Sequence, residues 1–556
     1  MAKFLKLVAL TSVIFVLAAC AKLPSILTDQ LGPQVVTSDK NESLYYSPSS
    51  PVTGSTQEQI LDGFLYAGNG PQDDYAVARK YLTIGFSPKW NPAQETLIQN
   101  GENKIVSNTG TKIRLLVHFD AKVNQDGTYE QTPGSSRILE FHLLQESGQW
   151  RIASAPDLTI LLQPNFNVLF KALPVFFWDK SLAYLVPDVR WFPTKASLAT
   201  RLTNALIAGP TSWVQPAVQN LLPAGTKLNI NSVTISGGLA SVDLNANALK
   251  LPTWKRPYLR SQLLATLGGI DGVTRVNISL ERSVQEVPQG PSGMPGNTSN
   301  LPVLLTKNGL SHIAGTALFE IRGTKQIVVD TKATAFAISG DETLVALLGK
   351  GSVYSYSLGL LTSKLQVIDA RTGLLQPTID AFNGIWTASS TSGAFIRVTS
   401  PNGTQVSIAN PYGNSVSIRQ LAVSPEGSRL AIVHDTLHGT SVDLFPIVRD
   451  GNRKVVSLGS PITLGDFGPN TDTISWVDHI NLDGISLDST GHQQTVSDVI
   501  GGASIIGRQT FDATAIVTTV GGSQYYLNRE GTLFASKGLG WEQIQTNIVG
   551  VRMAGQ

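Results

Sequence analysis

The stretch VTISGGLASVDL, residues 233–244, alternates apolar and polar side chains on both sides of a glycine pair. Alternation with a period of two is typical of a half-buried β-strand, and Gly237–Gly238 can adopt the positive φ angles of a tight turn. A β-hairpin is therefore predicted here. Downstream, an amphipathic helix is expected over residues 257–267, followed by a closing strand over residues 273–280. The hairpin, the helix and the further strand together predict a small α+β unit.

A second amphipathic helix is expected upstream, over residues 194–208, and Gly209–Pro210 ends it. Its apolar face consists of Leu198, Leu202, Ala205 and Leu206. The series resembles the GerMN domain of spore-germination and envelope proteins, and this implies such a domain over residues 161–285. Asp243, at the end of a strand, is interpreted as a turn or cap residue rather than a ligand. The pieces that carry the resemblance are LIAGPTS (206–212), LPAGTKL (222–228), ISGGLASVDL (235–244) and VTRVNISLE (273–281).

Residues 56–160 predict a second α+β domain. Two helical segments, 57–67 and 73–82, precede several extended runs of alternating side chains. Asp126–Gly127 marks a hairpin turn between two of these runs. Two helices followed by a curved antiparallel sheet resemble the cone-shaped fold of nuclear transport factor 2, which often holds a pocket.

Residues 286–300 are rich in Pro, Gly, Ser and Asn and predict a linker that proteases cut first. Beyond it, residues 301–556 contain many short strand-and-turn units. The segments AISGD (337–341) and AVSPEG (422–427) each precede an apolar strand and lie 85 residues apart, about twice the length of a propeller blade. At roughly 43 residues per blade, the region predicts a β-propeller of about six blades. A pair of β-sandwiches is the alternative fold. Candidate markers of other repeats are Ile385–Trp386 and Ser475–Trp476.

The amino terminus has the order of a secretory signal peptide, because two lysines precede an apolar run over residues 7–19. That run is shorter than the roughly 20 residues needed to span a bilayer. It ends in Leu17-Ala18-Ala19-Cys20, which resembles a bacterial lipobox. We therefore expect residues 1–19 to be a signal peptide, cleavage between Ala19 and Cys20, and a diacylglyceryl group on the Cys20 thiol. Residues 20–55, rich in Pro, Ser and Thr, predict a lipidated flexible tether. Cys20 is the only cysteine, so an intramolecular disulfide is excluded.

Composition and missing motifs limit the function. A chain of 556 residues is too long for one core and predicts about three domains. A net charge of +2, only 15% charged residues and no long basic run make nucleic acid an unexpected partner. The sequence contains no nucleophile elbow, zinc-protease helix, phosphate loop or cysteine metal cluster. We accordingly predict no catalytic residue, no cofactor and no metal site.

Four histidines are candidates for catalytic or metal-binding residues. His434 and His438 have a spacing that would bring two ligands together on a helix, with Asp435 between them. Their context is a strand, so we expect both to be exposed strand positions rather than ligands. His118 and His142 lie in extended runs and are interpreted as solvent-facing or hydrogen-bonded strand residues rather than catalytic bases.

The whole arrangement resembles the LpqB-type lipoproteins of actinobacteria. The resemblance is carried by the lipobox, YAVARKYL (75–82), LVPDVRW (185–191), the GerMN-like series and the propeller. It implies a protein anchored by lipid to the extracytoplasmic face of the cell membrane. It further implies binding to the extracytoplasmic domain of a sensor histidine kinase of the MtrAB two-component system, and an influence on envelope growth and division. Only Cys20 is carried over as a defined functional residue.

The predicted fold class is thus multidomain and mainly β with α+β parts. It comprises a nuclear transport factor 2-like domain, a GerMN-like domain and a C-terminal β-propeller. The alternative function is an envelope glycan-binding scaffold, or a hydrolase or lyase, with its site in the mouth of the propeller. Absent motifs do not exclude this alternative, because propeller sites assemble from separate blades.

Overall fold

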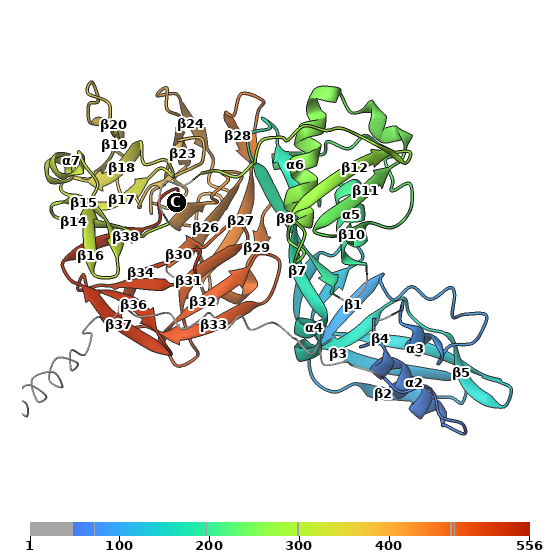
Figure 1. Ribbon diagram of the computed structural model, residues 1–556. Helices are drawn as coiled ribbons and strands as arrows, with labels where there is room; N and C mark the ends of the chain where they lie inside the picture. Colours follow the sequence, from blue (N-terminus) through green and yellow to red (C-terminus); the bar gives the residue numbers. More distant parts are fainter. Residues whose placement is uncertain (1–47, 72, 195–196, 297–299, 468–469, 472) are drawn as a thin grey trace, which may run out of the picture. The chain divides into compact units, whose positions relative to one another are not determined.

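The computed structural model describes residues 48–556, apart from residues 72, 195–196, 297–299, 468–469 and 472 (Figure 1). Pro48–Gln556 is one compact unit, and strands dominate it. The multidomain, mainly β fold predicted from the sequence is confirmed. Within the described part of the chain, no helix is long and apolar enough to cross a membrane. The predicted cleavage site and lipid attachment at Ala19 and Cys20 lie outside the described residues.

The N-terminal module packs two helices against a sheet of order β5-β4-β3-β1-β6, with β2 also paired to β3. The sheet is mixed rather than purely antiparallel, because β6 returns beside β1 and runs parallel to it. The elements are α2 (Gln57–Ala67), α3 (Ala76–Arg79), β1 (Glu95–Gln99), β2 (Lys104–Asn108), β3 (Lys112–Asn124), β4 (Tyr129–Glu146), β5 (Gln149–Ser154), β6 (Thr159–Leu162) and α4 (Gln163–Leu169).

The two helices differ in how they begin. Helix α2 starts at a capping box, in which the Thr56 hydroxyl accepts from the Gln59 N–H and the Gln59 side chain accepts from the Thr56 N–H. Helix α3 is shorter than the predicted segment 73–82. The reason is that residues 73–75 all hold positive φ angles, which a right-handed helix cannot contain.

The predicted turn and strand residues of this module are confirmed. Asp126–Gly127 lies in the turn that joins β3 to β4, and Gly127 adopts a φ of 86°. His118 in β3 and His142 in β4 are exposed strand residues. Neither has a surrounding that would make it a buried catalytic base.

Aromatic side chains fill the space between the helices and the sheet. The ring centroids of Phe64 and Trp90 lie 4.9 Å apart, and those of Phe64 and Phe141 lie 6.4 Å apart. All three side chains are buried. The interior of this module is therefore a packed core rather than the ligand pocket that a cone-shaped fold often holds.

The central module contains the hairpin predicted from residues 233–244. Gly237 and Gly238, with φ angles of 54° and 76°, join β10 to β11. Strand β11 then pairs in parallel with β12, which the chain reaches through α6. The elements are β7 (Phe170–Asp179), β8 (Leu185–Pro193), α5 (Leu198–Ala208), η2 (Gln215–Ala217), β9 (Val218–Gln219), β10 (Thr234–Ser236), β11 (Leu239–Leu244), η3 (Ala246–Lys250), η4 (Thr253–Lys255), α6 (Arg256–Leu267), β12 (Arg275–Leu280) and β13 (Ser283–Val284).

Asp243 stabilises a turn through hydrogen bonds, as predicted. Its carboxylate accepts hydrogen bonds from the Asn229 side chain at 2.9 Å and from the Arg282 N–H at 3.0 Å. The second bond holds the turn that follows β12, so the carboxylate is occupied by the protein's own groups. Helix α5 begins at Leu198, four residues later than predicted.

Residues 286–294 contain no helix or strand and most of them are exposed, but the segment packs against the central module at Gly293. The Gly293 carbonyl accepts a hydrogen bond from the Leu185 N–H at 2.7 Å. A Cβ at Gly293 would lie 2.7 Å from side-chain atoms of both Leu185 and Trp178. Glycine and proline prevent regular structure, but here the missing side chain also lets the backbone lie directly against β7 and β8.

The C-terminal module is a β-propeller, and in the described residues it has six sheets of four strands, one with the additional strand β29 (Figure 1). Strand β14 pairs with β38, so the first sheet joins the start of the module to its end. The innermost strands β38, β17, β21, β25, β30 and β34 contact one another in ring order. The ring arrangement leaves only short inner strand edges, which neighbouring blades protect. The predicted propeller of about six blades is confirmed, and the pair of sandwiches is wrong.

The blades are given from the innermost strand outward. They are β38 (Ile548–Arg552), β14 (Val303–Thr306), β15 (Gly309–Ala314) and β16 (Ala317–Glu320); β17 (Ala333–Ile338), β18 (Leu344–Gly349), β19 (Ser352–Ser357) and β20 (Gln366–Asp369); β21 (Thr378–Ile379), β22 (Ile385–Thr387), β23 (Ile396–Thr399) and β24 (Gln405–Ile408); β25 (Ile418–Val423), β26 (Arg429–Thr436), β27 (Gly439–Arg449) and β28 (Val455–Leu458), with β29 (Ile462–Thr463); β30 (Thr473–Trp476), β31 (Asn481–Leu487), β32 (Gln493–Val499) and β33 (Ser504–Gln509); and β34 (Ala513–Thr518), β35 (Gln524–Asn528), β36 (Leu533–Lys537) and β37 (Gly540–Gln545). Helix α7 (Thr324–Thr331) and the short η5 (Gly465–Phe467) lie between strands.

The repeat signals map onto equivalent blade positions. Segments 337–341 and 422–427 both join the first strand of a blade to the second, in blades two and four, as their spacing predicted. The spacing of the two tryptophan-containing segments, 385–386 and 475–476, is uneven because Trp386 lies on the second strand of its blade, β22. Trp476 lies on the first strand of its blade, β30. Position within a blade therefore explains the irregular spacing.

Candidate binding site

Two regions of the fold could hold a ligand, and the first is the axis of the propeller. There the Gly555 N–H donates to the Ile338 carbonyl at 2.8 Å. The Gln556 side chain accepts from the Ser475 hydroxyl at 2.7 Å and donates to the Trp476 carbonyl. Ile338 ends β17 in blade two and Ser475 lies on β30 in blade five, which face each other in a six-bladed ring. Residues 555–556 therefore bridge blades two and five, and Figure 1 shows this end of the chain among the strands of the propeller.

Charged side chains inside the propeller pair with one another. Arg429 Nε lies 2.8 Å from Glu426 Oε1, and both side chains are fully buried. Burial by itself would raise the pKa of Glu426, but the Arg429 guanidinium outweighs it and holds that pKa at about 2. A second buried pair joins Arg449 to Asp380 at 2.5 Å. These charges neutralise each other within the fold, which is the arrangement of structural ion pairs.

His434 is buried, and our expectation of an exposed strand residue is wrong. Only 8% of it is exposed, its Nε2 lies 3.1 Å from Asp443 Oδ2, and its ring stacks on Tyr412 at 3.8 Å between centroids. His438 is exposed in the hairpin that follows β26. The burial pattern of β26 explains why the expectation for His434 is wrong, because both faces of this strand are buried as far as His434. Across the described residues, no group of three or more His, Cys, Asp or Glu side chains is arranged to hold a metal ion.

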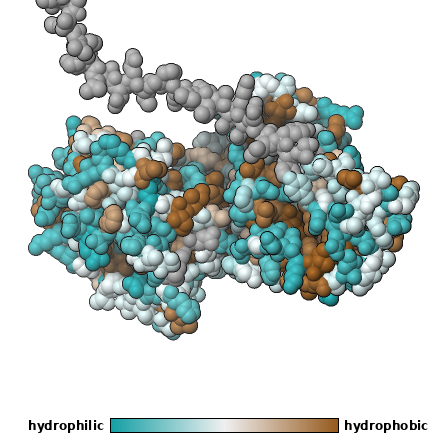
Figure 2. Space-filling view, turned by 90° about the horizontal axis from the view of Figure 1, so that it is seen from below, coloured by the Kyte–Doolittle hydropathy of each residue, from teal (hydrophilic) through white to brown (hydrophobic). Residues whose placement is uncertain are grey.

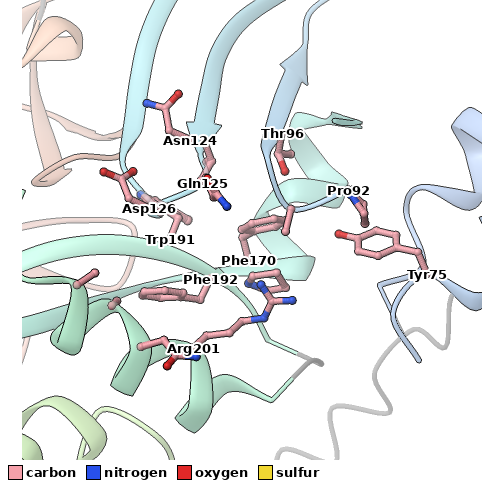
Figure 3. Close-up of a pocket in the computed structure, with 17 residues that line it drawn as sticks. Tyr75, Pro92, Thr96, Asn124, Gln125, Asp126, Phe170, Trp191, Phe192 and Arg201 are labelled. Carbon is pink, nitrogen blue, oxygen red and sulfur yellow. The ribbon is translucent and has the colours of Figure 1, made fainter. Parts of the chain in front are cut away.

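The second region is a cavity of about 460 Å³ beside the turn between β3 and β4, which we name the seam cavity. One wall comes from the N-terminal module and the other from β7, β8 and α5 of the central module (Figure 3). Its polar groups include Thr96, Asn124, Gln125, Asp126, Arg201 and Asn204. Its aromatic groups are Tyr75, Phe170, Trp191 and Phe192. The seam cavity is open to solvent, unlike the core of either module.

Arg201 and Tyr75 give the seam cavity its polar end. Figure 3 shows the Arg201 side chain extending from α5 beneath the rings of Phe170 and Phe192, on the side from which Tyr75 enters the view. Burial raises the pKa of Tyr75 to about 12, although the nearby Arg201 charge acts in the opposite direction. The phenol is therefore neutral at physiological pH and can donate a hydrogen bond.

Arg201 and Tyr75 were not among the site residues predicted from the sequence. Arg201 is the one charged residue of α5, within the apolar series LATRLTNALIA, and that isolation was the available signal. Tyr75 left no comparable signal, because its position depends on the left-handed backbone of residues 73–75. Conversely, the structure does not bring His434 and His438 together as a pair, and Cys20 lies outside the described residues.

Along the chain, the three modules are an α+β module, a GerMN-like domain and a β-propeller. This order of modules defines a class of protein. Three family models match successive parts of the chain: "Lipoprotein LpqB, N-terminal domain" over residues 50–167, "Sporulation and spore germination" over residues 174–286, and "Lipoprotein LpqB beta-propeller domain" over residues 308–550. The chain belongs to the LpqB family of lipoproteins. Membership of this family implies a membrane-anchored lipoprotein.

Two curated relatives match most of the chain. A lipoprotein LpqB of Cutibacterium acnes is 24% identical over 457 residues, or 76% of each chain. One of Mycobacterium ulcerans is 23% identical over 539 residues, or 86% of this chain and 89% of the relative. Among solved structures, the first GerMN domain of GerM from Bacillus subtilis is 20% identical, with a TM-score of 0.18, over 22% of this chain and 93% of that one.

Proposed function

We propose that this protein is an extracytoplasmic accessory protein, held to the cell membrane by a lipid on Cys20. In this proposal it binds and modulates an MtrAB-type sensor histidine kinase, and so influences envelope growth and division. It acts by binding and not by catalysis. Lipidation confines it to the membrane that holds the kinase, and confinement raises the effective concentration of one partner around the other.

The observation that carries the proposal is the combination of a lipoprotein family with a propeller whose opposite blades are bridged by residues 555–556. The interior charges of the propeller are paired in the fold, so they support structure and leave surfaces for recognition. Apolar patches interrupt the polar surface in Figure 2. Outer strands contribute exposed apolar side chains, which are common at protein-binding surfaces. These are Leu318 and Phe319 on β16 and Ile505 and Ile506 on β33.

The test is crosslinking in cells followed by purification of the lipoprotein from membranes, with the kinase detected by antibody. The wild-type protein should capture the kinase, and Cys20→Ser should capture much less, because serine cannot form the thioether that carries the lipid. Phosphorylation of the response regulator, measured at matched expression, should change in parallel.

A rescue variant separates confinement from lipid chemistry. Cys20→Ser attached to an uncleaved membrane-spanning signal anchor restores confinement without restoring the lipid. We expect it to recover both kinase capture and response-regulator phosphorylation. Equal capture by wild-type and unanchored protein would contradict the role of confinement, and no capture by any variant would contradict the kinase partnership.

A further inference from the structure

We propose that one face of the N-terminal module docks on the surface of an anionic lipid bilayer. Its apolar side chains enter the headgroup layer, and its cationic side chains contact lipid phosphates. We name this surface the exit face and define it by Val52, Lys80, Ile84, Lys89 and Arg151. The inference rests on the membrane anchor of the proposed function and is independent of the kinase partnership.

The exit face lies where the described chain begins. The Tyr81 hydroxyl donates to the Ser49 carbonyl at 2.9 Å, and the Gly54 N–H donates to Gln149 Oε1 at 2.8 Å. Both bonds join the start of the described chain to residues next to the exit face. The preceding part of the chain, which leads to the anchor, therefore leaves the module at this face.

The length of that preceding part limits how far the exit face can lie from the anchor. Residues 21–47, which number 27, connect Cys20 to the first described residue. Such a chain reaches at most about 95 Å when fully extended, and it spans roughly 30 Å as a flexible coil. An anchored protein would therefore bring the exit face to the bilayer repeatedly. The lipid surface is the partner that this face meets through its position in the chain.

The exit face presents apolar side chains to solvent. Ile84 is 85% exposed and Val52 is 70% exposed. Single exposed apolar side chains are common, so their exposure alone does not identify a binding surface. Ile84, however, is presented by an ordered turn, because its N–H donates to the Glu146 carboxylate at 3.2 Å. Its transfer into a headgroup layer removes apolar area from water without first ordering the loop.

Cationic side chains lie on the same side of the module as Ile84. Ile84, Lys80 and Arg151 line one open groove. Three of the five charged residues that line this groove are cations, and one of these, Arg79, is paired with Asp74 at 2.7 Å. The groove therefore has a net positive charge, which attracts lipid phosphates.

The other two cations of the groove have neutral hydrogen-bond partners. Lys80 Nζ donates to the Ser50 hydroxyl at 3.2 Å, and Arg151 Nη1 donates to the Trp150 carbonyl at 2.6 Å. Neither partner neutralises the charge, and both side chains have further N–H groups to donate. The exposed Lys89 adds a third cation directly after Pro88, which also lines the groove. Exposed apolar side chains beside cations are the combination that binds an anionic lipid surface.

The experiment measures how fast lysine side chains are acetylated when the protein lies on two kinds of membrane. The full-length lipidated protein is placed in nanodiscs of phosphatidylcholine, or of equal parts phosphatidylcholine and phosphatidylglycerol. Acetic anhydride is the neutral reagent, and mass spectrometry of peptides gives the rate at each lysine. We expect Lys80 and Lys89 to react about fivefold more slowly in the anionic nanodiscs. Lys350, exposed in the propeller, should react equally in both.

Matched variants test whether the protection belongs to the exit face. Ile84→Asp replaces an apolar side chain by a charge that phosphates repel, and it should make the rates at Lys80 equal in the two membranes. Leu539→Asp makes the same change at a propeller position that is 99% exposed and should preserve the fivefold difference. Arg151→Gln removes one cation and should give an intermediate difference. Circular dichroism confirms that each variant is folded.

Three results would overturn the proposal. One is equal acetylation of Lys80 and Lys89 of the wild-type protein in the two membranes. Another is protection that persists in folded Ile84→Asp, and the third is its loss in Leu539→Asp. The nanodiscs contain no kinase, and loss of Cys20→Ser from cell membranes tests the anchor separately. Failure of docking is therefore distinguishable from failure of the proposed function.

Discussion

The arginines of the propeller and of the seam cavity differ in their surroundings. In the propeller, Arg429 is fully buried against Glu426 and the Trp476 ring. In the seam cavity, Arg201 is half-buried at the wall of an open space. The comparison shows that the surroundings of a charged side chain decide its role. A charge that is surrounded by its partners, as Arg429 is, stabilises the fold. Arg201, by contrast, lines an open cavity and also interacts within the protein.

Removal of the closing strand should have the largest effect. Deletion of residues 548–556 removes β38 and the residues that bridge the channel, including the buried side chains of Ile548, Val551 and Met553. Their loss is expected to cost roughly 5–9 kcal/mol, which is comparable with the whole stability of a domain. Thermal unfolding followed by circular dichroism should therefore lose the transition of the propeller. Leu539→Ala, at an exposed hairpin tip, is the control and should leave that transition unchanged.

Breaking the buried ion pair should follow. Arg429→Met leaves the fully buried Glu426 carboxylate without its main partner and should lower the free energy of unfolding by about 3–5 kcal/mol. Urea unfolding at pH 7 measures this. Lys537→Met breaks the exposed pair with Glu542 and should change stability by less than about 1 kcal/mol. Similar effects of the two substitutions would remove the contrast between buried and exposed charges.

The same pair predicts a dependence on pH. The pKa of Glu426 is about 2 in the folded protein, below its ordinary value of 4.5. A carboxyl with a depressed folded pKa stabilises the protein fully above the unfolded pKa, and this stabilisation is lost as the pH falls through the folded pKa. We therefore expect the melting temperature to fall less steeply between pH 5 and pH 2 in Glu426→Gln than in the wild type. Parallel curves for the two proteins would contradict the assignment.

Substitution of His434, in β26, and of His438, in the hairpin that follows it, should have smaller effects on stability that differ from each other. His434→Ala removes the hydrogen bond from His434 to the buried Asp443 carboxylate, which keeps the bond from the Thr463 hydroxyl, and should cost about 1–3 kcal/mol in free energy of unfolding. His438→Ala, four residues further along and exposed, should stay within about 0.5 kcal/mol. Urea unfolding of the two variants side by side measures the difference. An equal, small effect would restore the view of both as exposed strand residues.

The smallest effect on stability is expected in the seam cavity. Arg201→Gln should change the free energy of unfolding by less than about 1 kcal/mol, because the side chain is half-buried beside an open cavity. The measurement is urea unfolding, with Arg429→Met as the opposite extreme. A loss as large as that of Arg429→Met would mean that Arg201 stabilises the fold as strongly as the buried ion pair does.

The extent of sequence-based prediction can be judged from particular elements. Helix α6, the Gly237–Gly238 hairpin and the Asp126–Gly127 turn were predicted closely, because each depends on a local pattern. The start of α3 was not, because nothing local shows that residues 73–75 adopt positive φ angles. None of the residues that line the seam cavity was predicted as a site residue, although the Asp126–Gly127 turn was predicted, since the cavity joins segments far apart in the chain.

The sequence by itself determined the order of the modules and the approximate number of blades, because hydrophobic periodicity and turn residues act over short distances. The tertiary structure alone decided what each charged or polar group does. His434 is buried because neighbouring strands cover both faces of β26, and opposite blades are bridged because Gln556 reaches β30, 81 residues away. Arg201 lines an open cavity because two modules meet beside it without filling the space. Burial and partners are properties of long-range packing, which no short segment of the sequence contains.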